Sequence, residues 1–463
     1  MADWTLAELE EWDDRIRDRV EEFGLECHPQ EFEVCDHNQM LGYMAYSGMP
    51  SHYPHWSYGK SFERLKTFYD HGVSGIPYEM VINSNPSIAY LMRDNSLLLQ
   101  ILTIAHVYGH NDFFRNNFTF KTTHPEYTIG AFKSRANRVR SYIEDPTIGL
   151  ERVETILDAA HALSLQCRRN LGIHKETLTQ ARQRAFDAAQ PPADPFHKAH
   201  GPREYVEPDL RRNPPEPESD LLLFIRDNNP YFSEWERDLL TMAHEEAQYF
   251  IPQIETKIMN EGWASFWHQK ILESLDLPPA LTIEFLVRHN QVVCPHEGGL
   301  NPYHLGIKIW QDLDARFAGE GSGREALFAI READRDSSFL RRHLTADLVR
   351  ELDLFQYSAQ GDDLVVTEVS DEEGWKVVRD TLVRNVGSNT LPVIQVVDGD
   401  HDGRRTLLLQ HVHDGRDLHP EYAEKTLNFV HQLWPHEVVL DTNLGGKHTQ
   451  LVCNDRGFAI RAA

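Results

Sequence analysis

The chain has 463 residues, which is more than one average domain, and its 41% hydrophobic and 10% aromatic content is enough for substantial cores. Its formal net charge of −26 disfavours nonspecific binding to nucleic acid or to an anionic membrane surface. Five scattered cysteines, without a Cys-x-x-Cys pair, argue against a disulfide framework. The N-terminus has no signal-peptide pattern, and no apolar run is long enough to span a bilayer. We therefore expect a soluble, cytoplasmic protein of two or three domains.

The first part of the chain is predicted to alternate helices with irregular, aromatic segments. Apolar residues recur at helical spacing from Leu6 to Phe23, which predicts an amphipathic helix. Glycines and prolines break the segment 33–68, and we expect a helix only around 60–69. Residues 77–86 favour a short strand closed by an Asn-Pro turn. The apolar segment that follows predicts one helix from Ser87 to Tyr108.

The rest of the chain divides into helical and strand-rich parts. Residues 220–348 resume the helical spacing of residues 1–190, after a segment at 191–219 that holds eight prolines and reads as a linker. From 349 to 463 the pattern changes to short strands interrupted by two helices. We therefore predict an α+β fold with a predominantly helical N-terminal and central domain, split by the linker, and a small α+β domain at the C-terminus.

Two histidines interrupt an apolar helical segment. His106 and His110 are four residues apart, so on a helix both rings leave the same face, with Cβ atoms about 5–6 Å apart. This spacing suits two ligands of one metal ion. Gly109 between them would allow a substrate or another backbone to approach closely. The alternative is a buried pair hydrogen-bonded to Asn or Asp side chains, such as Asn111 or Asp112, and both interpretations stay open.

A second polar cluster lies farther along the chain, in the segment MNEGWASFWHQK. On a helix Glu261, Ser265 and His268 fall along one stripe. A carboxylate far downstream of a His-x-x-x-His helix completes a His₂Glu zinc site, which leaves one position for a water that the metal acidifies. We predict zinc held by His106, His110 and Glu261, with His268 as a further ligand candidate. The alternative for Glu261 is a helix cap or a buried salt bridge.

The residue after the first histidine is not a general base. In the zinc-hydrolase motif H-E-x-x-H a glutamate occupies that position, whereas this chain has Val107. We expect the base from a separate segment and name Glu246 first and Glu245 second. Near them His244 and Gln248 imitate a ligand pair, a match that chance alone produces in a chain of this length.

Several segments together resemble the SpoVR (stage V sporulation protein R) family. In chain order they are GMPSHYPHWSYGKSFE, YEMVINSNPSIAYLM, AHVYGHNDFFRNNF, EEAQYF, TKIMNEGWASFWH and GLNPYHLG. The resemblance implies a role in spore cortex formation, or in stress or starvation signalling. It also implies partnership with a PrkA-type serine kinase and a von Willebrand-type protein. It supplies no established reaction.

Two functions remain open from the sequence. The first is a zinc-dependent, zincin-like hydrolase of peptide or amide bonds. Its substrate groove is expected to be lined by Tyr53, His55, Trp56, Tyr58, Asn83, Asn301 and Tyr303. The second is a non-catalytic adaptor or regulator that acts with the kinase, in which the histidines only hydrogen-bond within the core. A dinuclear iron or manganese site ranks last because the chain offers too few Glu-x-x-His pairs.

Overall fold

The computed structural model describes residues 4–71, 79–168, 176–189, 212–295, 299–318, 323–360, 363–368 and 373–462. The chain forms two compact units. Unit 1 comprises Met1–Arg140 and Pro252–Thr390, and unit 2 comprises Ser141–Ile251 and Leu391–Ala463. Most of the proline-rich segment lies outside the described residues, and the four-part division of the chain at 190, 219 and 348 stays a prediction.

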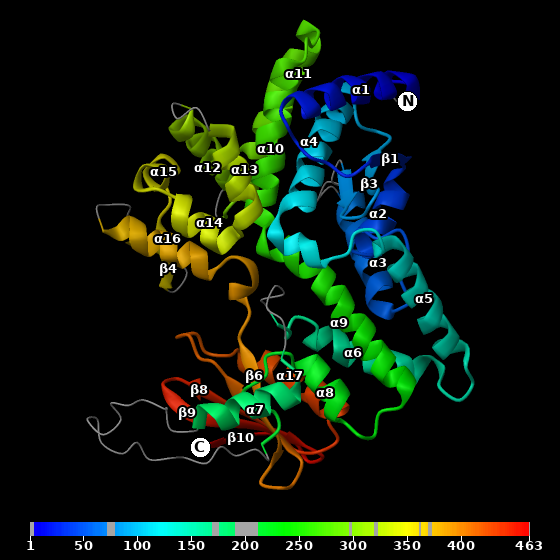
Figure 1. The fold of residues 1–463 in the computed structure, drawn as a ribbon, viewed down its shortest axis with the longest axis vertical. Coiled ribbons are helices and arrows are strands. Elements are labelled where there is room, and N and C mark those ends of the chain that lie inside the picture. The colour runs from blue at the N-terminus through cyan, green and yellow to red at the C-terminus, as the bar shows by residue number, and fades with distance from the viewer. Residues whose placement is uncertain are drawn as a thin grey trace. The chain divides into compact units, whose positions relative to one another are not determined.

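Unit 1 is mostly helical (Figure 1). Its helices are α1 (Leu6–Glu22), α2 (His37–Ala45), α3 (Trp56–Asp70), α4 (Leu97–Asn116), the start of α5 (Thr128–Glu144), α10 (Lys257–Ser274), α11 (Pro279–Val293), α12 (Pro302–Phe317), α13 (Gly323–Ala333), α14 (Asp336–His343), α15 (Ala346–Glu351) and α16 (Gly374–Arg384). The N-terminal helix matches its prediction. Thr5 caps it through a hydrogen bond from the backbone N–H of Glu8, whose side chain accepts from Thr5 in return.

A three-stranded sheet stands where one long helix was predicted. Strand β3 (Ser87–Met92) is central, parallel to β1 (Gln30–Cys35) and antiparallel to β2 (Glu79–Ile82). The predicted helix from Ser87 to Tyr108 is therefore wrong over its first part, and α4 begins only at Leu97. Because β3 has a neighbour on each side and is largely buried, its sequence lacks the alternation that marks a half-exposed strand.

Helix α4 crosses α10 at very short range, and Figure 1 shows the two helices side by side. A Cβ atom built on Gly109 would lie 2.6 Å from the α-carbon of Ala264. Two residues before Ala264 on α10, a Cβ on Gly262 would lie 2.4 Å from the backbone of Gly306 in α12. The close approach expected at Gly109 is thus that of another backbone, and it places the histidine-bearing turn of α4 against α10.

Replacement of Gly109 by alanine is expected to lower the free energy of unfolding by about 1–3 kcal/mol, because α4 and α10 must move apart. Gly59 in α3 is the matched control, since a Cβ there meets nothing within 4 Å. Gly59→Ala should raise the free energy of unfolding by roughly 0.5–1 kcal/mol, as alanine does in an open helical position. Chemical denaturation measures both. Equal effects of the two substitutions would contradict the tight crossing.

A buried aromatic cluster surrounds the crossing of α10 with its neighbours. Trp263 and Trp310 are fully buried, with ring centroids 4.6 Å apart. At the start of α10 the buried carboxylate of Asp336 accepts hydrogen bonds from the backbone N–H groups of Ile258 and Met259, at 2.9 Å each. This side chain from α14 therefore satisfies the N-terminus of α10, where no side chain of α10 itself provides a cap.

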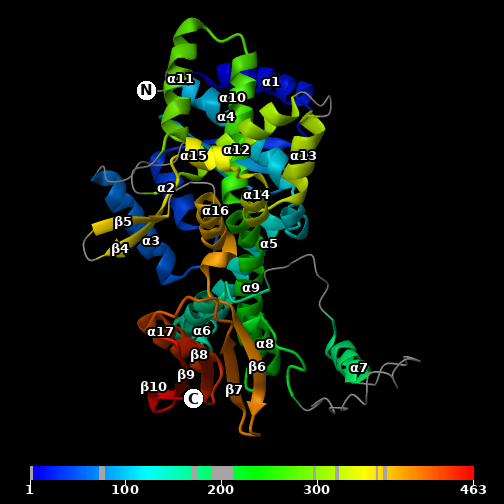
Figure 2. The same ribbon diagram turned by 90° about the vertical axis from the view of Figure 1, so that its left-hand side faces the viewer.

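Unit 2 contains the second sheet. Five strands follow the order β10-β9-β8-β7-β6 and lie side by side in Figure 2. The elements of this unit are α6 (Gly149–Leu163), α7 (Leu178–Ala189), α8 (Leu221–Asn228), most of α9 (Glu234–Glu255), β6 (Ile394–His401), β7 (Thr406–His411), α17 (Pro420–Leu433), β8 (Val438–Leu444), β9 (Lys447–Asn454) and β10 (Gly457–Ala462). The α+β class with a helical main part is confirmed.

A separate, smaller antiparallel pair of strands precedes α16 in the sequence. These strands, β4 (Gln356–Gln360) and β5 (Asp363–Glu368), form a hairpin. Among the described residues, no helix combines the length and the apolarity that crossing a membrane requires.

Candidate metal centre

The two histidines of α4 share one buried face, as their spacing predicts. Their ring centroids lie 4.6 Å apart, and His106 and His110 are 2% and 7% exposed. Ser96 begins this helix, where its hydroxyl accepts from the N–H of Leu99, and the following apolar turns bury it against α10. Both imidazoles are therefore held inside unit 1, where an unpaired polar atom is costly.

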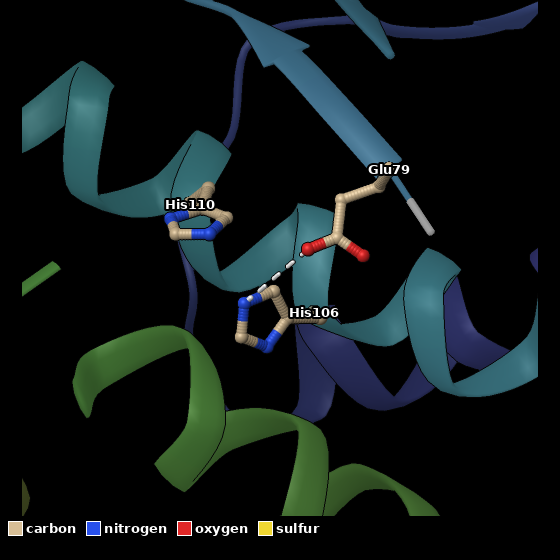
Figure 3. Close-up of side chains that lie close together, drawn as sticks. All are labelled: Glu79, His106 and His110. Carbon is tan, nitrogen blue, oxygen red and sulfur yellow. Dashed lines mark ion pairs between the residues drawn. The ribbon is translucent and has the colours of Figure 1, made fainter. Parts of the chain in front are cut away.

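Two carboxylates face these rings. Glu261 of α10 places Oε2 at 3.5 Å from Nε2 of His110 and at 3.9 Å from Nε2 of His106. Glu79, the first residue of β2, places Oε1 at 3.8 Å from Nε2 of His106. A dashed line marks this pair in Figure 3. Among the described residues, Glu79, His106 and His110 form a group whose ligand atoms all lie within 4.8 Å of one another.

The outward nitrogen of each ring is already engaged. Nδ1 of His110 lies 2.8 Å from the amide oxygen of Asn260, so that nitrogen donates. Nδ1 of His106 lies 2.8 Å from Nδ1 of His268. With its proton on Nδ1, the His110 ring turns the lone pair of Nε2 toward the carboxylates, and neutral imidazoles bind metal in this form. The alternative interpretation is met in part, because His110 bonds to an Asn side chain, although that residue is Asn260. The side chains of Asn111 and Asp112, its two named examples, hydrogen-bond to other groups.

Burial and mutual charge set the protonation of the group. Burial is the main cause that lowers the pKa of His106 to about 4, so the ring is neutral at physiological pH. Burial, helped by the charge of Glu261, raises the pKa of Glu79 to about 8. Burial alone would also raise the pKa of Glu261, but His106 and His110 together with the Tyr303 hydroxyl lower it overall. One carboxylate is thus held charged and the other protonated.

The spacing of these atoms fits a metal ion. With bonds of about 2.0–2.2 Å, two ligand atoms of a tetrahedral shell lie about 3.3–3.6 Å apart. The observed 3.5–3.9 Å requires only small side-chain rotations. Among the residues that the structure describes, three buried atoms of this group have no hydrogen-bond partner: Nε2 of His106, Oε2 of Glu79 and Oε2 of Glu261. Buried polar atoms are usually satisfied, so these three are open for a shared ligand.

The remaining predicted ligand, His268, lies behind His106. Its Nδ1 contacts His106, and its Nε2 lies 2.8 Å from Nδ1 of His289 in α11. Both ring nitrogens are therefore occupied by histidines, and neither faces the carboxylates. The structure brings His268 to the site as a neighbour of a ligand candidate.

Tyr303 is the predicted groove residue that reaches the site. Its ring lies 6.2 Å from that of His106, and its hydroxyl hydrogen-bonds to Glu261. Asn301 begins α12: its side chain accepts from the N–H of Tyr303 and donates to the carbonyls of Val292 and Cys294. Asn301 thus holds Tyr303 in place through backbone contacts.

The other groove candidates are also residues of unit 1. Tyr53 is fully buried and His55 is 7% exposed, whereas Trp56 is 51% exposed at the start of α3. Tyr58 packs with its ring 5.9 Å from that of Tyr53. Asn83 is buried and donates to the hydroxyl of Thr123. The substrate role of these five residues stays a prediction.

The two candidate bases belong to unit 2. Glu245 is exposed and Glu246 is 7% exposed, both on α9. The neighbouring His244 places Nε2 at 2.8 Å from the carboxylate of Asp220, which also caps α8. The ring of His244 thus pairs with a carboxylate of its own unit. The two candidate bases and the two histidines thus belong to different units, and the role of Glu246 and Glu245 stays a prediction.

Three contributors were missed in the sequence: Glu79, Asn260 and His289. Asn260 directly precedes Glu261, and a helix that presents one of them to a site holds the other close by. Glu79 is the acidic residue within the apolar strand segment 77–86, and an acidic residue in such a strand was an available signal. Nothing in the sequence around His289 relates it to His268.

Comparison with known proteins agrees with this architecture. The family model described as SpoVR like protein matches residues 3–391, and the model described as SpoVR-like C-terminal domain matches residues 392–444. The chain is 33% identical over 481 aligned positions to the protein named Uncharacterized protein YcgB of Escherichia coli (strain K12), covering 95% of this chain and 92% of that protein. No solved structure matches. Because the first model alone matches most of the chain, including both helices of the histidine site, the chain belongs to the SpoVR family.

Proposed function

We propose that this protein is a metal-dependent hydrolase of peptide or amide bonds, with a zincin-like site in unit 1. The observation that supports it most is that Glu261 lies 3.5 Å from Nε2 of His110 and 3.9 Å from Nε2 of His106, while Glu79 lies 3.8 Å from Nε2 of His106. Two imidazoles and carboxylate oxygen suit Zn²⁺. The set replaces the H-E-x-x-H motif that the chain lacks.

The geometry gives the two carboxylates different roles. Glu261 lies within 3.9 Å of both histidines, so it is the better third ligand. Tyr303 orients it through the hydroxyl hydrogen bond. Glu79 approaches His106 alone, and we assign it the proton of the attacking water, the role for which Val107 is unsuited. A bound Zn²⁺ supplies Lewis acidity and lowers the pKa of a coordinated water to about 7.

The role assignment is tested with Glu79→Gln. Purified protein is expected to hold about one equivalent of zinc, measured by mass spectrometry of the metal, and to cleave members of a fluorogenic peptide library. Glu79→Gln should keep the zinc and lose kcat by about 100-fold or more, as removal of a general base does. Glu246→Gln is the comparison for the base predicted from the sequence. Protein without zinc, or full activity in Glu79→Gln, would refute the proposal.

Metal affinity is expected to rise with pH, by up to about tenfold per pH unit, until it levels off near pH 8. Since the pKa of Glu79 is raised to about 8 from an ordinary 4.5, the metal-free site holds a proton at pH 7 that the cation displaces. Between pH 4.5 and about pH 8 the folded, metal-free chain binds more protons than the unfolded chain, because Glu79 keeps its proton only in the folded state. The contribution of Glu79 to stability without metal therefore falls as pH rises through this range.

Calorimetry in buffers of different ionisation enthalpy counts the displaced proton. At pH 7 the protein should release about one proton more per zinc than Glu79→Gln, and at pH 9 the difference should vanish. The variant corrects for protons that come from water bound to the metal. An equal release by both proteins at pH 7 would show that Glu79 is not the protonated group.

The cellular setting stays a prediction from the family resemblance. Partnership with a PrkA-type kinase and a von Willebrand-type protein is tested by affinity capture from cells that express all three. The adaptor alternative is separated from the hydrolase by complementation of a deletion strain: Glu79→Gln restores function in an adaptor and fails to do so in a hydrolase.

A further inference from the structure

Three histidines form a continuous hydrogen-bonded chain that begins at the site. Nδ1 of His106 lies 2.8 Å from Nδ1 of His268, and Nε2 of His268 lies 2.8 Å from Nδ1 of His289. The rings come from α4, α10 and α11. They are 2%, 0% and 8% exposed in that order, so the chain runs from the site through the core toward the end nearest to solvent.

The proton positions on these three rings depend on one another. Each 2.8 Å contact between two ring nitrogens needs one N–H that donates and one lone pair that accepts, so each contact holds one proton. A neutral imidazole donates through one nitrogen and accepts through the other. The proton position on any one ring therefore dictates the positions on the other two.

Only two orders satisfy both hydrogen bonds. In the first, His106 donates from Nδ1 to His268, which donates from Nε2 to His289, and Nε2 of His106 keeps its lone pair. In the second, His289 donates to His268, which donates to His106, and the proton of His106 lies on Nε2. Only the first order leaves Nε2 of His106 able to bind a metal ion beside Glu79 and Glu261.

We infer that His268 and His289 are positioning residues that fix His106 in the Nδ1–H tautomer, so that a side chain two rings away from the metal sets its affinity. The inference rests on the proposed metal site. Partners that hold a ligating histidine in one tautomer raise its basicity, and their loss typically weakens metal binding by about 10–100-fold. His110 has its own partner in Asn260, so the hydrogen bonds of His268 and His289 act on only one of the two histidine ligands, His106.

The test uses three substitutions at His289 that differ in hydrogen bonding. His289→Ala removes the acceptor of His268 and should weaken zinc binding by about 10–100-fold in competition with a chromogenic chelator. His289→Asp offers only an acceptor near the former Nδ1, favours the first order, and should bind zinc at least as tightly as the parent. His289→Asn accepts or donates and should lie between them, which covers the case that aspartate impairs folding.

His411 supplies the matched control. It is a buried histidine of unit 2 whose Nδ1 lies 2.9 Å from the hydroxyl of Thr442, and His411→Ala should leave zinc affinity unchanged. Proton–nitrogen NMR of histidine-labelled, zinc-loaded protein should show His268 and His289 protonated on Nε2. Zinc binding by the parent together with equal affinity of His289→Ala overturns this inference alone, as does a zinc-loaded His268 protonated on Nδ1. A parent that binds no zinc overturns the proposed function and this inference with it.

Discussion

Replacement of His110 by alanine is expected to abolish tight zinc binding, with a larger loss than the roughly 10–100-fold typical of changes behind a ligand. The ring supplies one of two nitrogen ligands, and Nε2 lies 3.5 Å from Glu261. Removal leaves at most one imidazole and the carboxylates, which is a poor set for Zn²⁺. Zinc content and chelator competition measure the effect, and peptide hydrolysis should be lost in parallel.

Two further substitutions define what this result means. Glu261→Gln keeps the shape of the side chain but removes its charge, and should also lose zinc. His304→Ala removes a histidine of α12 whose Nδ1 bonds to the carbonyl of Val293, and should retain zinc. Retention of a full equivalent of zinc by His110→Ala would exclude the proposed ligand set.

Conversion of Asp112 to asparagine is expected to destabilise the protein by about 3–5 kcal/mol, because it leaves the guanidinium of Arg331 buried without its counter-charge. Asp112 is completely buried, and its Oδ1 lies 2.7 Å from Arg331 of α13. The same carboxylate accepts from the indole of Trp263 and from the backbone of Glu26. One side chain of α4 thus joins α10, α13 and the N-terminal segment, two residues after His110.

The control for this prediction lies on the same helix, α13. Glu332 forms an ion pair of 2.8 Å with Lys121, but both side chains are more than half exposed. Glu332→Gln should change the free energy of unfolding by less than about 1 kcal/mol, as exposed pairs do. Removal of both buried charges, in Asp112→Asn with Arg331→Gln, should recover part of the loss. Denaturation that ranks Asp112→Asn with Glu332→Gln would show that the buried pair contributes little.

Local pattern alone was enough for most elements of the fold. The stripe from Leu6 to Phe23 reports the single buried face of α1, and the capping pair at Thr5 and Glu8 marks its start. Of the strand-rich part predicted from 349 to 463, the residues after 390 form the sheet of unit 2, whereas β4 and β5 pair separately in unit 1. The segment from Ser87 was assigned wrongly because a strand covered on both sides is uniformly apolar, as a buried helix is. Only its pairing with β1 and β2 distinguishes the two.

Within the site, the sequence determined what each helix can offer. Spacing on α4 places His106 and His110 on one face, and Glu261 stands out as an acidic residue in an apolar helix. Which groups meet was decided by the tertiary structure. The α4–α10 crossing at Gly109 brings Glu261 to the histidines, and β2 adds Glu79 from a separate segment. Spacing along a helix is fixed by its geometry, whereas contacts between elements depend on packing across the whole unit.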